Sequence, residues 1–381
     1  MAKKVYIGVN NVARKVKKMY VGVNGVARKV KKGYIGVGGI ARPFWTGGEL
    51  VYYGTLEPLA AERQYIGAAS FEDYALFAGG ESYSAGSRYS VVDAYSKSLT
   101  HTNPDALTNY ICHLAGTVVG AYALFGGGRR STGTVFASVD AYNRSLTKST
   151  AADLSEKRYG LSATTVGNYA LFAGGDATSG RRSSVVDAYD ASLTRTTTTP
   201  LYYARDSIGA TTVGSHALFA GGDASSGRKA CVDAYDASLT RTTPTELSIA
   251  KEGAGATTIG GHALFGGGFT PSGCTGTVDA YNASLTRITL SALSVARYDM
   301  GAVTIGGYAL FGGGSIANPN PPNTVDVYDE SLTSSVTSGL SSGRARPGVA
   351  TVGDYALFVG GSGTSTGSDS GRDNVDVYAI A

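Results

Sequence analysis

The chain has 381 residues, of which 54 are glycine and only 16% are charged, and its formal net charge is +4. This composition excludes a mainly helical protein, which would favour Glu, Lys and Leu over Gly, Ser, Thr and Tyr, and it is typical of a turn-rich all-β chain. Residues 1–48 contain eight lysines and three arginines and no acid, which leaves a net charge of −7 for residues 49–381. A basic N-terminal arm therefore precedes an acidic body.

The cysteines and the hydropathy pattern exclude several further classes. Cys112, Cys231 and Cys274 have neither metal-ligand nor disulfide-framework spacing, so we expect free thiols. The first residues lack the continuous apolar segment of a signal peptide, and no run approaches the roughly 20 apolar residues of a membrane span. We expect synthesis in the cytoplasm without a signal peptide, no membrane contact, no metal and no cofactor.

Residues 1–48 contain three copies of a 14-residue unit. Tyr6-Ile7-Gly8-Val9 recurs as Tyr20-Val21-Gly22-Val23 and Tyr34-Ile35-Gly36-Val37, each followed by two Asn or Gly residues and then Val-Ala-Arg or Ile-Ala-Arg. Asn-Gly and Gly-Gly between such runs predict β-hairpins, because a type I′ turn needs positive φ at both central positions. Three short hairpins bury little surface, so we expect the arm to gain order by forming a homo-oligomer or by docking on another protein.

Tandem units close to Val-Asn-Gly-Val-Ala-Arg-Lys-Val-Lys-Lys-Gly-Tyr resemble short repeats at the ends of structural proteins of phages and prophages from Gram-positive bacteria, here over residues 3 to 48. The resemblance implies a virion component of the tail, baseplate or decoration type that contacts other virion proteins. We assign particle attachment to the aromatic and basic residues of the arm: Tyr6, Arg14, Tyr20, Arg28, Tyr34, Arg42 and Trp45.

Two other interpretations of the basic arm remain open. Its lysines could contact the phosphates of an anionic wall polymer or of a nucleic acid, the latter being a partner we do not expect. They could also form a solvated face that discourages edge-to-edge aggregation, as lysines on edge strands often do.

Residues 49–381 repeat one motif seven times. An aromatic residue or histidine is followed by Ala-Leu-Phe, one variable residue and two glycines, beginning at Tyr74, Tyr122, Tyr169, His216, His262, Tyr308 and Tyr355. A period of 46 to 48 residues with several short apolar runs predicts one four-stranded propeller blade per repeat. We predict an all-β fold, a seven-bladed β-propeller, closed by strand 50–56 pairing with 375–380, because the last repeat ends without a fourth strand.

Two further features recur in these repeats. A third-strand tyrosine is found at Tyr95, Tyr142, Tyr189, Tyr235, Tyr281, Tyr328 and Tyr378. A basic residue ends the crossover between repeats at Arg63, Arg158, Arg205, Lys251, Arg297 and Arg346, whereas the second crossover has His113-Leu114. With the double glycines, this pattern resembles the kelch family and implies a kelch-like propeller. The fourth-strand tryptophan of that family is missing, so the chain would be a divergent branch.

Seven aspartates occupy one equivalent place in the third strands: Asp93, Asp140, Asp187, Asp233, Asp279, Asp326 and Asp376. A residue required in every blade serves the blade, so we interpret these acids as hydrogen-bond acceptors and not as a metal or catalytic ring. The loop after each double glycine varies instead, and we expect it to share one face with the crossovers. Its cations and aromatic residues suit sugars with anionic groups: Tyr83, Arg88, Tyr89, Arg129, Arg130, Arg181, Arg182, Arg228, Lys229, Phe269 and Arg372.

Enzyme chemistry has weaker support. The four histidines do not form a zinc or copper set in sequence, and no nucleophile elbow is present. A glycosidase would need two carboxylates, for which Glu81, Asp105, Asp369 and Asp373 are the candidates. We therefore expect a non-enzymatic virion protein whose loop face binds a host-surface polysaccharide or another virion protein. The alternatives are a carbohydrate-active enzyme with a wall-binding arm and an intracellular kelch-type interaction scaffold.

Overall fold

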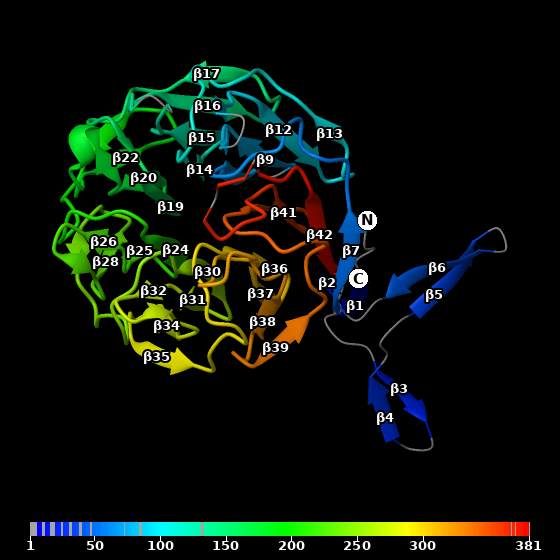
Figure 1. Cartoon of the computed structure of the whole chain (residues 1–381). Helices are drawn as coiled ribbons and strands as arrows, with labels where there is room; N and C mark the ends of the chain where they lie inside the picture. The colour runs from blue at the N-terminus through cyan, green and yellow to red at the C-terminus, as the bar shows by residue number, and fades with distance from the viewer. Residues whose placement is uncertain are drawn as a thin grey trace.

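Seven four-stranded antiparallel sheets stand in a ring around a central opening (Figure 1). The computed structural model describes residues 48–380 except 72, 84–85, 131–132, 367 and 370, with the backbone alone at 179, and the backbone of six strands within residues 6–45. The arrangement confirms the predicted seven-bladed β-propeller. No helix in these described residues is long and apolar enough to cross a bilayer.

Each blade runs from an inner strand at the central opening to an outer strand at the rim. Blades 1 to 3 are β8 (Gly67–Phe71), β9 (Tyr74–Ala78), β12 (Val92–Ser96), β13 (His101–Thr102); β14 (Ala115–Val119), β15 (Tyr122–Gly126), β16 (Val139–Asn143), β17 (Lys148–Thr150); and β19 (Ser162–Val166), β20 (Tyr169–Ala173), β22 (Val186–Tyr189), β23 (Arg195–Thr197). Blades 4 to 6 are β24 (Gly209–Val213), β25 (His216–Ala220), β28 (Val232–Asp236), β29 (Arg241–Thr242); β30 (Gly255–Ile259), β31 (His262–Gly266), β34 (Val278–Asn282), β35 (Arg287–Leu290); and β36 (Gly301–Ile305), β37 (Tyr308–Gly312), β38 (Val325–Asp329), β39 (Ser334–Thr337).

The seventh blade joins the two ends of the propeller. It consists of β40 (Gly348–Val352), β41 (Tyr355–Val359), β42 (Val375–Ile380) and, as its outer strand, β7 (Leu50–Thr55). Leu50 lies opposite Ile380, and a bulge between Val377 and Tyr378 shifts the register. Because β40 also contacts β8, the ring of inner strands is closed.

Short strands complete the fold. The loops after the double glycines contain β10 (Glu81–Ser82), β11 (Ser87–Arg88), β21 (Asp176–Ala177), β26 (Asp223–Ala224), β27 (Gly227–Arg228), β32 (Phe269–Thr270), β33 (Gly273–Cys274) and the 3₁₀-helix η1 (Thr178–Gly180), and β18 (Arg158–Tyr159) pairs with β21. In the arm, three two-stranded sheets pair β1 (Tyr6–Val9) with β2 (Val12–Lys15), β3 (Tyr20–Val23) with β4 (Val26–Lys29) and β5 (Gly33–Val37) with β6 (Ile40–Trp45). The side chains proposed for particle attachment lie outside the described residues.

The repeated motif builds the interfaces between blades. In blade 3, Phe172 and Tyr189 meet edge to face at 5.7 Å and pack against Leu124 and Ala141 of blade 2. Such aromatic pairs add about 0.5–1.5 kcal/mol beyond the area that they bury. The Tyr189 hydroxyl donates a hydrogen bond of 2.8 Å to the carbonyl of Ala152 in the crossover, and the other six third-strand tyrosines bond to their crossovers in the same way.

The third-strand aspartates are buried acceptors, which confirms their structural interpretation. In blade 3, Asp187 is fully buried, lies 2.7 Å from Arg158 and accepts the backbone N–H of Ser155. Each of the seven accepts such an N–H from its crossover. The alignment of the seventh crossover was wrong by two residues, because Arg344, and not Arg346, pairs with Asp376.

Blade 2 differs from the other blades because, among the described residues, no buried basic residue lies beside its third-strand aspartate. Ile111 occupies the place of the buried basic residue, and Asp140 bonds instead to the backbone and hydroxyl of Thr108. The double glycines are structural as well, since a Cβ on Gly221, at φ +69°, would lie 2.5 Å from the carbonyl oxygen of Lys251. They carry the chain past the neighbouring crossover.

Candidate binding face around the central channel

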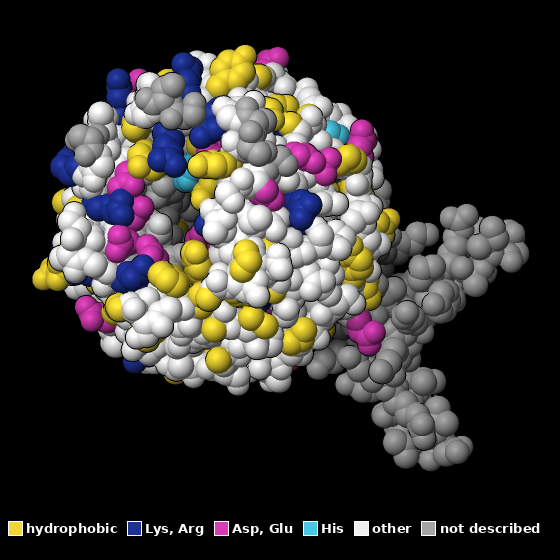
Figure 2. All heavy atoms as spheres, viewed as in Figure 1, with side chains coloured by type: hydrophobic (Ala, Val, Ile, Leu, Met, Phe, Trp, Pro, Cys, Tyr) yellow, Lys and Arg dark blue, Asp and Glu magenta, His cyan; other side chains and the backbone are white. Residues whose placement is uncertain are grey.

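The variable loops and the crossovers meet on one face of the propeller. In every blade the residue after the double glycine pairs with a crossover residue. These pairs are Glu81 with Gln64, Arg129 with Cys112, Asp176 with Tyr159, Asp223 with Asp206, Phe269 with Glu252, Ser315 with Tyr298 and Ser362 with Ala345. Figure 2 shows basic and acidic side chains gathered around a hollow in the face that it views.

The next crossover residue in each blade borders the central opening. We call these seven the mouth ring: Tyr65, His113, Gly160, Ser207, Gly253, Asp299 and Arg346. All have φ between +50° and +62°. Backbone bonds join neighbours in this ring, such as His113 N–H to the carbonyl of Tyr65 at 3.2 Å and Asp299 N–H to that of Gly253 at 2.8 Å. One backbone geometry therefore presents seven different residues around one opening.

The backbone conformation of this ring suits glycine, which two of the seven blades use. A side chain in the left-handed region costs about 1–2 kcal/mol per residue, yet five blades carry one. Leucines of the opposite turns, such as Leu146 and Leu193, also have positive φ, but they are the same residue in each turn and pack on the core. The mouth ring instead varies from blade to blade, and Tyr65, His113 and Arg346 belong to none of the core clusters.

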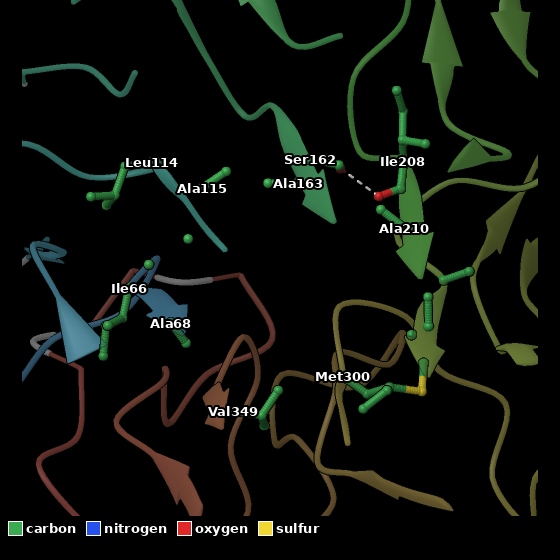
Figure 3. Close-up of a pocket in the computed structure, with 17 residues that line it drawn as sticks. Ile66, Ala68, Leu114, Ala115, Ser162, Ala163, Ile208, Ala210, Met300 and Val349 are labelled. Atoms are coloured by element: carbon green, nitrogen blue, oxygen red, sulfur yellow. Dashed lines mark hydrogen bonds between the residues drawn. The ribbon is translucent and has the colours of Figure 1, made fainter. Parts of the chain in front are cut away.

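Below the mouth ring lies a cavity of about 270 Å³ inside the channel. Figure 3 shows Ile66, Leu114, Ile208, Met300 and Val349, from five different blades, around this shared space. The only hydrogen bond drawn there joins the Ser162 hydroxyl to the carbonyl of Ile208 at 2.6 Å. Pockets that enclose a whole small ligand have volumes of roughly 300–1,000 Å³. The channel can accept part of a ligand, so most of one would lie across the mouth.

One side of the mouth is aromatic and cationic. The rings of Tyr65 and His113 stack with centroids 3.6 Å apart, and the edge of Tyr159 lies beyond His113 at 6.0 Å. The guanidinium of Arg346 lies 5.1 Å from the centre of the Tyr65 ring, and that of Arg129 lies 4.4 Å from the centre of the Tyr159 ring. These five residues form what we call the cationic half of the mouth.

The opposite side carries more acids than bases. Arg182 binds Asp176 and lies 3.3 Å from Asp206 and 2.9 Å from Asp223. Burial raises the pKa of Asp206 to about 7; Arg182 opposes this, while Asp176 and Asp223 add to it. Nearby, Glu252 binds Arg228 at 2.8 Å. We call Asp176, Asp206, Asp223 and Glu252, with their two arginines, the acidic half of the mouth.

The structure places the predicted face residues in three settings. Four arginines lie at or beside the mouth. Arg88 binds Glu81 at 2.6 Å, and Arg228 lies 4.6 Å from the centre of the Phe269 ring. Arg129 belongs to the cationic half and Arg182 to the acidic half. Farther out, Arg130 lies over Phe136, Arg181 binds Glu156, and Lys229 lies over Tyr203. Of the rest, Tyr83 is 59% exposed, while Tyr89 and Arg372 bond through their backbones to Gly80 and Arg63.

Among the residues that the structure describes, two clusters have donor atoms close enough for a metal ion. In one, the Cys112 thiol donates to Glu81 at 3.2 Å and lies 3.2 Å from His113 Nδ1. Arg88 already binds Glu81, and nearby guanidiniums oppose a further cation. The other consists of Asp206, Asp223 and Glu252, whose charges Arg182 and Arg228 partly neutralise. Both donor sets therefore fit a cation poorly.

The four glycosidase candidates do not form a matched pair. Glu81 is buried against Arg88. Asp369 accepts bonds from the Ser362 hydroxyl at 2.7 Å and from the Gly363 N–H at 2.6 Å, so it holds its own loop. No hydrogen bond joins the side chain of Asp105 or Asp373 to another described candidate. Of the histidines, His101 lies in β13 and bonds to Asp93 at 2.7 Å.

The mouth ring itself was not among the predicted site residues. A signal was present, because six of its seven members lie two residues after the buried basic residue of their crossover, for example Tyr65 after Arg63 and Gly160 after Arg158, and His113 lies two residues after Ile111. Aligning the crossovers on that buried residue exposes a position that is glycine in two blades and Tyr, His, Ser, Asp or Arg in the other five. The wrong alignment of Arg346 concealed this pattern.

No protein-family model and no curated protein matches this chain. Among solved structures, that of YjhT superposes with a TM-score of 0.61, covering 74% of this chain and 99% of YjhT at 14% sequence identity. At that identity the likeness concerns the fold alone. The chain is a seven-bladed β-propeller, and its activity has to be derived from its own mouth and loops.

Proposed function

We propose that this chain is a non-enzymatic binding protein whose crossover face holds a ligand across the mouth of the central channel. The observation that carries the proposal is the mouth ring, where five of seven blades keep a side chain in a conformation that favours glycine. Strain retained at positions that differ between otherwise similar repeats is typical of a functional surface.

The size and chemistry of the mouth favour a polymer or a protein surface over a small enclosed molecule. The cavity of about 270 Å³ is too small to bury most of a drug-sized ligand. The aromatic rings of Tyr65 and His113, with the neighbouring arginines, offer apolar ring surface and charged donors, which are the groups that bind sugars. We therefore propose a surface polysaccharide as the ligand, with another virion protein as the alternative.

The finer assignment is a virion component of a phage or prophage, located in the virion. The tandem basic units of residues 1–48 support attachment to a particle, and the double glycines, third-strand tyrosines and crossover arginines support a kelch-type origin for the propeller. In this proposal the arm contacts other virion proteins or forms a homo-oligomer, and the propeller faces the host surface.

Binding is tested on an array of purified bacterial surface polysaccharides with the full chain. The variant Tyr65→Gly/His113→Gly/Arg346→Gly gives the ring the residue that it already uses at Gly160 and Gly253, so we expect it to fold and to lose at least about tenfold in affinity. Asn168→Gly, in a turn of the opposite face, is the matched control. A folded triple variant that binds as well as the full chain would refute the proposed site.

The virion assignment is tested by immunogold labelling of phage-like particles with antibody against residues 49–381. Label at a tail tip is expected for host recognition, and label over the head or tube would indicate a structural or decoration role. Particles without label would end the virion assignment and leave the binding site unaffected.

A further inference from the structure

The two halves of the mouth differ in their charge balance. The cationic half and its border contain Arg88, Arg129 and Arg346, and of these Arg88 pairs with Glu81 and Arg346 with Asp299 at 3.1 Å. The acidic half contains four carboxylates against two arginines. A ligand that lies across the mouth therefore meets a positive side and a negative side.

Arg129 supplies the unbalanced positive charge. Its guanidinium lies 4.4 Å from the centre of the Tyr159 ring, and none of the described acidic residues forms an ion pair with it. Its backbone is fixed on both sides by bonds to Cys112, at 3.0 and 3.1 Å. A half-buried arginine with a fixed backbone, whose guanidinium bonds to the Tyr159 hydroxyl but to none of the described acids, is suited to bind a carboxylate or a phosphate with its remaining donors.

The pKa of His113 reflects the same positive potential. Burial and the guanidiniums of Arg129, Arg346 and Arg88 hold its pKa well below the usual value, so the ring is neutral at physiological pH. The ring lies flat on Tyr65. A neutral aromatic surface beside a guanidinium without an acidic partner accommodates a sugar ring and its charged substituent together.

We infer that the ligand carries an anionic group, a carboxylate or a phosphate, which binds Arg129 while the adjoining sugar ring packs against His113 and Tyr159. This inference rests on the proposed function and deepens it. The anion would stand where the arginine now has no acidic partner, at the border between blades 2 and 3. The acidic half would repel a second anion, and so it sets the direction in which a charged polymer crosses the mouth.

The site is tested directly with inorganic phosphate and the full chain, observed by NMR of ¹³C-labelled histidine. The chain has four histidines. We expect a saturable shift of the His113 resonance at phosphate concentrations up to about 20 mM, as for a weak single-anion site. Arg129→Gln should abolish the shift, and Lys97→Gln, which removes a cation paired with Asp73 at an exposed turn, should leave it unchanged. No shift of His113, or the same shift in Arg129→Gln, overturns the inference.

The source of the anion is distinguished with three oligomers of equal length: an oligogalacturonate, an oligo(glycerol phosphate) and a neutral oligoglucose. We expect one of the two anionic oligomers to bind at least about tenfold more tightly than the neutral one, and Arg129→Gln to remove that difference. If the chain binds neutral glycans on the array through the mouth ring and binds the anionic oligomers no more tightly, the inference fails and the proposed function stands. If the triple glycine variant retains all binding on the array, the proposed function fails independently of the phosphate result.

Discussion

At the scale of single residues, buried pairs of opposite charge fasten the crossovers to the blades. Arg158 and Asp187 have no exposed side-chain surface, and Arg158 also donates to the carbonyls of Phe172 at 3.0 Å and Gly174 at 3.1 Å. Burial lowers the pKa of Arg158, while Asp187 raises it. Removing one partner of such a pair leaves the other buried and unpaired, which is the costly case.

We therefore expect Arg158→Met to lower the free energy of unfolding by about 3–5 kcal/mol, measured by urea denaturation. Arg181→Met is the matched control, because Arg181 pairs with Glu156 at the surface, with 65% of its side chain exposed, and such a pair contributes about 0–1 kcal/mol. Similar losses for the two variants would show that the buried pair has no special role.

The raised pKa of Asp206 predicts how the stability of the fold depends on pH. Its pKa of about 7 in the folded chain exceeds the value of about 4 that an unfolded chain would have, so the folded state holds the proton more tightly. Stability should therefore fall as the pH rises from about 4 to about 7 and then level off. Asp206→Asn should remove this decline and be more stable than the parent by on the order of 1–2 kcal/mol at pH 8, with little difference at pH 4. Asp153→Asn, at an exposed crossover position, should leave the decline in place, and a decline retained in Asp206→Asn would assign it to another group.

At the scale of elements, β7 has a role different from that of the arm before it. It supplies the outer strand of blade 7, and the Tyr52 hydroxyl bonds to Asp376 at 2.6 Å, which with burial raises the pKa of Tyr52 to about 12. Without β7, the backbone groups of β42 would form an open sheet edge that invites aggregation.

Two truncations separate these roles. Deleting residues 1–47 should leave the thermal midpoint of the propeller within about 2 °C, because that deletion spares every blade strand. Deleting residues 1–55 should lower the midpoint by more than about 5 °C and increase light scattering on heating. Equal midpoints would mean that β7 adds little to the seventh blade.

At the scale of the whole molecule, closure of the ring links the stabilities of the blades. Each inner strand contacts the inner strands on both sides, and β40 contacts β8. An open repeat array can lose terminal units one at a time, whereas a closed ring has no terminal unit. We expect a single urea transition by circular dichroism, with hydrogen exchange in blades 1 and 7 as slow as in blade 4. Early exchange confined to blade 7 would indicate that the ring opens there before it unfolds.

The repeat period and the missing fourth strand of the last repeat were enough to predict the propeller, because each blade is specified by short, local and repeated patterns. The candidate site was predicted less well. Arg129 and Arg182 were found because they stand in variable loops, whereas Tyr65 and Asp206 stand in crossovers that the alignment treated as connections. The proximity of these crossover residues to the other residues of the mouth depends on the circular arrangement of the blades, which brings together residues more than 100 positions apart. The pairing of Arg182 with three carboxylates depends on the same geometry and has no counterpart in sequence spacing.

The partnership of β7 with β42 has a consequence for synthesis. Residues 50–55 are synthesised before the strands of the other six blades, but their partner, residues 375–380, is synthesised after them. Six blades can form while the early strand still has no partner, and the ring cannot close until β42 has left the ribosome. A nascent chain that stalls late would therefore present two unsatisfied strand edges at once, which makes incomplete products natural targets for chaperones and proteases.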